Sequence, residues 1–122
     1  MPAPVSILLI GRDERLLETR CLVLEASGYK TTAVRELSEL EEHFSRQAFD
    51  VLILCHSLRA SDVQQAVATA ATQPRPPKCL LLVTADIPAD LALPVARVSS
   101  REGPARLLQA VASLLKPPTN RR

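Results

Sequence analysis

The feature that most constrains this chain is the stretch 49–56 (FDVLILCH), in which an unbroken apolar run is bounded by polar residues. A strand that is buried on both faces of a sheet has this pattern, so we predict that residues 49–56 form the central strand of a parallel sheet. In an open α/β sheet, ligands bind beyond the carboxyl ends of the strands. Cys55 and His56, which end this run, therefore stand where a functional site is expected.

Four further segments are predicted to be strands, and segments with helical spacing of their apolar residues alternate with them. Units of this kind imply a parallel sheet with right-handed crossovers and helices on both faces. The predicted strands cover residues 5–10, 30–34, 49–56, 79–84 and 95–98.

Start and stop signals bound the predicted helices. Asp13 is suited to cap the first helix, and Gly28 is suited to end it in a left-handed conformation. The second helix is predicted around Leu40. Ser61 is expected to cap the third helix, which ends before a proline cluster at 74–77. Pro104 suits the first turn of the last helix.

The segment between the fourth and fifth strands is the exception. Ala85–Leu93 contains Pro88 and is followed by Pro94. Each proline removes a backbone donor and disfavours helical geometry in the residue before it. We therefore predict that the helix expected here is shortened or absent.

Chain length and aromatic content bound the fold class. The 122 residues are near the commonest size for one domain, so we expect a single domain over 1–122 with a frayed tail at 119–122. Hydrophobic residues make up 47% of the chain, but Phe, Trp and Tyr together only 2%. The core must then consist of Leu, Val, Ile and Ala, which favours an α/β fold over a β-sandwich.

Charge and cysteine usage exclude several classes of function. The formal net charge is +2 and the basic residues are scattered, which argues against direct binding of nucleic acid. The sequence has neither a leader nor an apolar run of the roughly 20 residues that a membrane span needs, so we expect a cytoplasmic protein without membrane contact. Cys21, Cys55 and Cys79 are odd in number and lack C-x-x-C spacing, which indicates buried thiols.

The glycine content excludes the common phosphate-binding loops. Gly11, Gly28 and Gly103 are the only glycines, so neither G-x-G-x-x-G nor G-x-x-x-x-G-K-[ST] occurs. The motifs G-x-S-x-G and H-E-x-x-H are absent as well. These absences exclude classical dinucleotide and P-loop binding, and for the chain as a whole we expect no cofactor, no bound metal and no enzymatic activity.

Three segments give the chain a resemblance to a known family. Residues 7–29 (ILLIGRDERLLETRCLVLEASGY), 49–55 (FDVLILC) and 80–85 (LLLVTA) resemble the opening, the phospho-acceptor strand and the fourth strand of receiver domains from bacterial two-component response regulators. The resemblance covers nearly the whole chain. It implies a flavodoxin-like (CheY-like) three-layer α/β/α sandwich, whose five-stranded parallel sheet has the order 2-1-3-4-5.

The resemblance does not extend to the residues that make a receiver active. An active receiver needs an acidic pair after the first strand to hold Mg²⁺, an acceptor Asp after the third, a Thr or Ser after the fourth and a Lys after the fifth. These positions correspond here to Gly11 and Arg12, Cys55, Thr84 and Ser100. Only Thr84 fits, which implies a degenerate pseudo-receiver that cannot form the usual acyl phosphate.

Residues of this degenerate pocket also have ordinary structural interpretations. Asp13 lies one position too late for the acidic pair and is better explained as a helix cap. A cysteine at the position of Cys55 is most often a small buried residue at a strand end. An arginine at the position of Arg12 is most often a solvated surface residue. His56 would point to the opposite face of the strand from Cys55, which argues against a nucleophilic Cys-His pair.

The resemblance implies a stand-alone module of bacterial two-component signalling that binds a protein partner without phosphorylation. Because the shortened helix would leave apolar side chains uncovered, we expect association with a partner, or with a second copy of the chain, on that side. The predicted interaction surface comprises Leu91, Leu93, Val98 and Arg101. Two alternatives stay open on this fold: a thiol-based sensor using Cys55, and an anion or small-ligand site formed by Arg12, His56, Thr84 and Ser100.

Overall fold

A computed structural model of the chain describes residues 5–55, 59–83, 96–99 and 103–115. Its elements alternate between strand and helix up to β4, and one further strand and one further helix come later in the chain. In chain order they are β1 (Ser6–Ile10), α1 (Glu14–Ala26), β2 (Lys30–Val34), α2 (Leu37–Arg46), β3 (Val51–Leu54), α3 (Ala60–Ala71), β4 (Lys78–Val83), β5 (Ala96–Ser99) and α4 (Pro104–Leu115).

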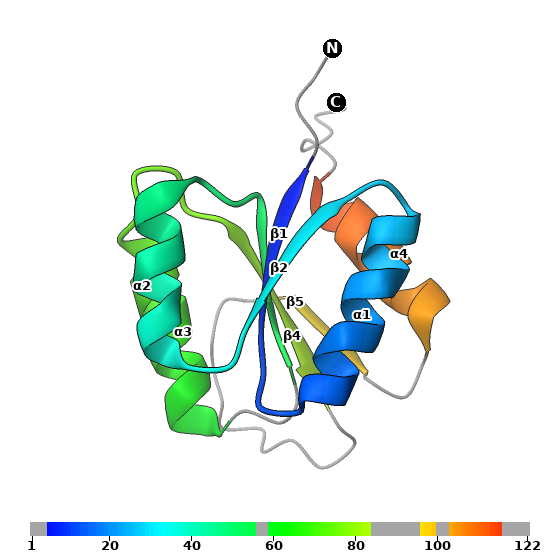
Figure 1. The fold of residues 1–122 in the computed structure, drawn as a ribbon, viewed down its shortest axis with the longest axis horizontal. Helices are drawn as coiled ribbons and strands as arrows, with labels where there is room; N and C mark the ends of the chain where they lie inside the picture. The colour runs from blue at the N-terminus through cyan, green and yellow to red at the C-terminus, as the bar shows by residue number, and fades with distance from the viewer. Residues whose placement is uncertain (1–4, 56–58, 84–95, 100–102, 116–122) are drawn as a thin grey trace, which may run out of the picture.

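The five strands form one parallel sheet with the order β2-β1-β3-β4-β5, which confirms the predicted topology. In the central ladder, Ile10 of β1 is aligned with Leu54 of β3, and Leu54 with Leu81 of β4. Figure 1 shows α1 and α4 on one face of the sheet and α2 and α3 on the other. The fold is therefore the predicted three-layer α/β/α sandwich.

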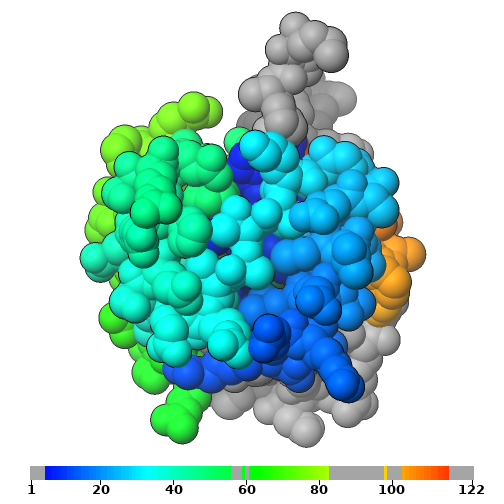
Figure 2. All heavy atoms as spheres, viewed as in Figure 1, coloured from blue at the N-terminus to red at the C-terminus, as the bar shows by residue number. Residues whose placement is uncertain are grey.

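Alternating strand residues divide the interior into two apolar layers. Ile7 and Ile53 belong to the layer under α1 and α4, whereas Leu8 and Leu54 belong to the layer under α2 and α3. Every residue of β3 is fully buried, as expected of a strand covered on both faces. β2 lies at one edge of the sheet, and Figure 2 shows it between the side chains of α1 and α2.

The predicted ends of α1 are confirmed. The Asp13 carboxylate accepts a hydrogen bond from the Leu16 amide at 3.2 Å, which satisfies one of the free amides at the helix start. Gly28 follows the helix with φ of +94°, a left-handed conformation that glycine adopts without steric cost.

The start of α3 differs from the prediction. Arg59, and not Ser61, occupies the N-cap position, and Ser61 lies within the first turn. The Asp62 carboxylate accepts the Arg59 amide at 3.3 Å, so an acid in the first turn satisfies the helix start in place of a serine hydroxyl. The preference of serine for the N-cap position favoured the wrong register, because it takes no account of an acid that reaches back from the first turn.

The predicted shortening of the helix between β4 and β5 concerns Ala85–Leu93, which lies outside the described residues, as does the tail at 119–122. The flanking strands β4 and β5 are nevertheless paired, with Leu82 aligned to Val98. Within the described part of the chain, no helix is both long and apolar enough to cross a membrane.

Candidate functional site

The carboxyl ends of β1 and β3 meet at one edge of the sheet. The Cys55 amide donates to the Ile10 carbonyl at 3.0 Å, and the Gly11 amide donates to the Val34 carbonyl at 3.2 Å. Gly11 and Cys55, two of the positions that the sequence analysis predicted for the pocket, therefore lie at neighbouring strand ends, where a parallel sheet places its ligand site.

Cys55 lies inside the apolar layer under α1 and α4, and only 2% of its surface is exposed. Burial raises the pKa of the Cys55 thiol, while the Arg20 guanidinium, which donates a hydrogen bond to the thiol, opposes that effect. The net direction is upward, so the thiol is neutral at pH 7. The structure thus places Cys55 as predicted, as a small buried residue at the end of the central strand.

Arg20 is a neighbour of Cys55 that the sequence analysis missed. It lies on α1 three residues after Leu17 and four before Leu24, both of which are buried. This spacing puts a charged residue on the inner face of the helix. It is the sequence feature from which a buried neighbour of the sheet could have been predicted. Arg20 is half-buried and reaches the end of β3 with its guanidinium.

Arg12 forms an ion pair with Asp62, which the sequence analysis also missed. The Arg12 guanidinium lies 3.1 Å from the Asp62 carboxylate, and it thereby joins the loop after β1 to the first turn of α3. The hydrogen bond from Arg12 lowers the pKa of Asp62, and the Arg59 amide adds to this effect. Arg12 is half-exposed, yet it is held in place at the pocket edge.

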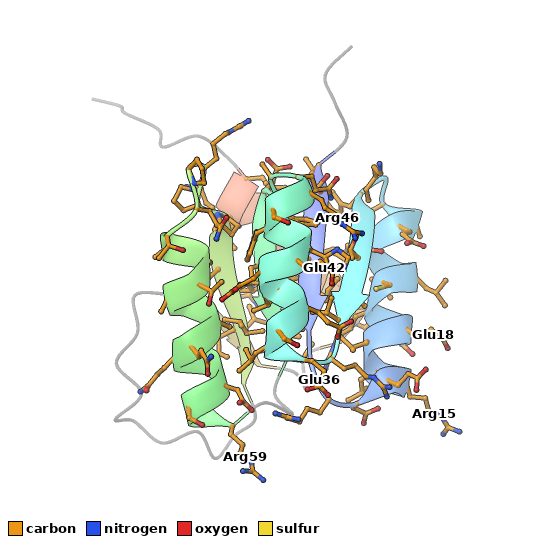
Figure 3. The ribbon with its side chains drawn as sticks, turned by 60° about the vertical axis from the view of Figure 1, so that its left-hand side comes forward. Arg15, Glu18, Glu36, Glu42, Arg46 and Arg59 are labelled. Carbon is orange, nitrogen blue, oxygen red and sulfur yellow. The ribbon has the colours of Figure 1, made fainter. Side chains whose placement is uncertain are left out.

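A second ion pair joins the start of α1 to the segment after β2. The Arg35 guanidinium, after β2, lies 3.3 Å from the Glu14 carboxylate at the start of α1. Figure 3 shows further charged side chains at this end of the molecule, with Arg15, Glu36 and Arg59 projecting from the starts of α1, α2 and α3. Charges of both signs alternate here, so this edge does not form a continuous basic or acidic patch.

The residues at the pocket do not fit the magnesium ion that a receiver requires. Mg²⁺ takes oxygen ligands, whereas Gly11 offers no side chain and Arg12 offers a cation. The Asp13 carboxylate is engaged at the helix cap, and Asp62 is held by Arg12. No group of three or more His, Cys, Asp or Glu side chains that could hold a metal occurs among the described residues.

Several predicted site residues lie outside the described part of the chain: His56, Thr84, Leu91, Leu93, Ser100 and Arg101. Val98, predicted as part of an interaction surface, is described and needs correction, because it is only 5% exposed and belongs to the layer under α1 and α4. Its place within β5, on the face covered by α4, explains why the side chain is buried.

No protein-family model and no curated protein matches this chain in sequence. Solved structures do match it. The signal receiver domain of an HD domain-containing protein from Pseudomonas fluorescens superposes with a TM-score of 0.79 at 21% identity, covering 93% of this chain and 95% of the other. A signal receiver domain of a histidine kinase from Clostridium thermocellum gives a TM-score of 0.77 at 18% identity, covering 94% and 100%.

A CheY-like response regulator receiver domain from Methylobacillus flagellatus gives a TM-score of 0.75 at 15% identity and covers 92% of this chain and 99% of that one. A chain from the complex of the histidine kinase ThkA with the response regulator TrrA gives 0.76 at 18% identity, covering 92% and 99%. These similarities agree with the strand order and with the two helical layers described above. The chain therefore has the CheY-like fold of response regulator receiver domains.

Proposed function

We propose that this protein is an atypical receiver of bacterial two-component signalling, which acts as a protein interaction module and does not depend on phosphorylation. The observation that carries the proposal is the Arg12–Asp62 ion pair at the pocket edge. In an active receiver this edge carries acids that hold a metal. Here a cation of the protein itself pairs with the acid on α3, and this contact joins the loop after β1 to that helix.

The residue at the acceptor position supports the same proposal. An acceptor must be ionised and accessible to an incoming phosphoryl group, which also needs a metal to neutralise its charge. Cys55 is buried and neutral, and the charged group on α1 that contacts it is Arg20. These properties of Cys55 therefore favour a receiver that keeps one conformation over a receiver that phosphorylation switches between two.

A protein partner is supported by the fold and by one of the similar structures. That structure is of the histidine kinase ThkA in complex with the response regulator TrrA. By analogy, we propose that this chain binds a signalling protein or an output domain. We place the interaction surface at Leu91, Leu93 and Arg101, with Val98 removed from the set because its side chain is buried.

The experiment that tests this function is affinity capture from the source cell, with the domain as bait, followed by binding of the purified partner. Binding is measured with acetyl phosphate and Mg²⁺ and again with a chelator, and the affinity is expected to be the same. Leu91→Arg and Leu93→Arg should each weaken binding. Leu22→Arg is the matched control, because Leu22 is 63% exposed on α1 and distant in sequence from the proposed surface. Loss of binding on removal of phosphate or Mg²⁺ would contradict the proposal.

The two alternatives have less support. A thiol-based sensor needs an accessible thiolate, which is opposed by the burial of Cys55 and by its raised pKa. An anion site at the pocket would use Arg12, whose guanidinium is already engaged by Asp62. Neither alternative is favoured by a contact among the described residues.

A further inference from the structure

A cavity of about 220 Å³ lies between α1 and α4, against β4 and β5. Its walls are largely apolar. The apolar side chains that line it include Leu16, Val23, Leu82, Val98 and Leu107. Three of these side chains, Leu82, Val98 and Leu107, belong to the buried layer of the core, so the floor of the cavity is part of the rigid interior.

Among the described residues that line this apolar space, Arg20 is the cationic one. Arg20 lines the cavity from α1, and one of its terminal guanidinium nitrogens is removed from solvent. The Thr19 side chain, which also lines the cavity, carries a hydroxyl that donates to the Arg15 carbonyl at 3.0 Å and retains acceptor lone pairs. A mostly apolar cavity with one or two directional polar groups is typical of small-molecule sites.

We propose that this cavity binds a small, linear monocarboxylate, whose methylene chain lies between α1 and α4 and whose carboxylate accepts hydrogen bonds from Arg20. A guanidinium carries five donors in a planar fork that matches a carboxylate. Its interaction with a ligand in this water-poor position is stronger than at an exposed site.

The volume sets the chain length of the ligand. The cavity of about 220 Å³ is smaller than the roughly 300–1,000 Å³ of a typical ligand pocket, so it can take only a short chain. We therefore use hexanoate, a six-carbon monocarboxylate, as the probe, with its carboxylate at the Arg20 guanidinium. The carboxylate would also share Arg20 with the Cys55 thiol, which links the cavity to the acceptor position.

The test uses hexanoate titrated into the isotope-labelled full chain, with amide and methyl shifts recorded. We expect saturable shifts on α1, α4 and β5. Hexanol, which has the same chain without the charge, should bind less tightly. Arg20→Gln should weaken hexanoate about tenfold or more, because a charge-assisted hydrogen bond is lost, and should leave hexanol within about twofold. Arg20→Lys should recover part of the loss.

Two further variants separate binding in the cavity from general effects. Val23→Phe fills the cavity from a half-buried position and should abolish the binding of both ligands. Arg15→Gln removes an exposed charge from the same helix and should change neither. If Arg20→Gln does not fold, the proposal is still tested by the relative affinities of hexanoate and hexanol. It is also tested by the loss of binding expected for Val23→Phe. Absence of saturable shifts, shifts confined to the α2–α3 side, or equal affinity for hexanoate and hexanol would overturn the proposal.

Discussion

The Arg12 guanidinium lies 3.1 Å from the Asp62 carboxylate and joins the loop after β1 to the first turn of α3. The two residues are 50 positions apart in sequence, and the sheet brings them together because β1 and β3 are adjacent and parallel. Under the proposed correspondence with receiver domains, Arg12 takes the position of one of the two acids that hold the metal in an active receiver.

The Arg12–Asp62 pair should make a small contribution to stability. Arg12 is 49% exposed, so solvent screens the attraction, and a double-mutant cycle of Arg12→Gln and Asp62→Asn should give a coupling free energy below about 1 kcal/mol. Asp62→Asn retains a side-chain oxygen that can accept a hydrogen bond from the Arg59 amide. The hydrogen bond at the start of α3 is therefore kept in every protein of the cycle. The measurement is urea unfolding. The exposed Glu42–Arg46 pair on α2, at 2.9 Å, serves as the control. A coupling of several kcal/mol would mean that the pair is far better shielded than its exposure indicates.

The same pair predicts a direction for the dependence of stability on pH. Arg12 lowers the pKa of Asp62 in the folded state, below the unfolded value of about 3.9. The contribution is therefore present above the unfolded pKa and is lost as the pH falls through the folded pKa. As the pH falls from about 5 to about 2, the parent should lose more stability than Asp62→Asn. Parallel curves for the two proteins would contradict the assignment.

Alanine substitutions should distinguish the core residues of β3 and β4 from Cys55 by their effect on the free energy of unfolding. Ile53 and Leu54 are fully buried on opposite faces of the sheet, and Leu82 is 2% exposed on β4. Replacing any of the three by Ala should cost about 2–5 kcal/mol in the free energy of unfolding, measured with urea. Cys55→Ala removes one sulfur atom and should cost much less. If Cys55→Ala unfolds the protein, the thiol has a structural role that its contacts do not explain.

The thiols should differ in reactivity in a defined order. Burial raises the pKa of all three thiols, and Cys55 is the least exposed of the three cysteines. Alkylation followed by peptide mass mapping should therefore modify Cys21 and Cys79 first in the folded protein, and all three at similar rates in denaturant. Rapid and selective alkylation of Cys55 in the folded protein would instead favour the thiol-sensor alternative.

Sequence pattern predicted the parts of this fold that depend on local signals. The fully buried run at β3, the Asp13 cap and the left-handed Gly28 each follow from residues close together in the chain. The strand order was implied by the resemblance to receiver domains and is confirmed.

The charged contacts at the pocket could not be predicted in the same way. Arg12 meets Asp62, and Arg20 meets Cys55, only after separate elements pack. The spacing of Arg20 from Leu17 and Leu24 is that of the inner face of α1, but spacing alone gives no information about which strand end the guanidinium reaches. Val98 was misplaced for a related reason, because whether a residue of an edge strand is covered depends on where α4 lies.

The central claim is that the pocket cannot be phosphorylated, and incubation with acetyl phosphate and Mg²⁺ tests it most directly. Intact mass and amide spectra are recorded for this protein beside a receiver domain that has the full acidic set. We predict no gain of phosphate mass and no shift on addition of Mg²⁺ or beryllofluoride, because Gly11, Arg12 and Cys55 supply neither metal ligands nor an acceptor. Covalent phosphate on a residue of this pocket, whether stable in acid or released by hydroxylamine, would contradict the account.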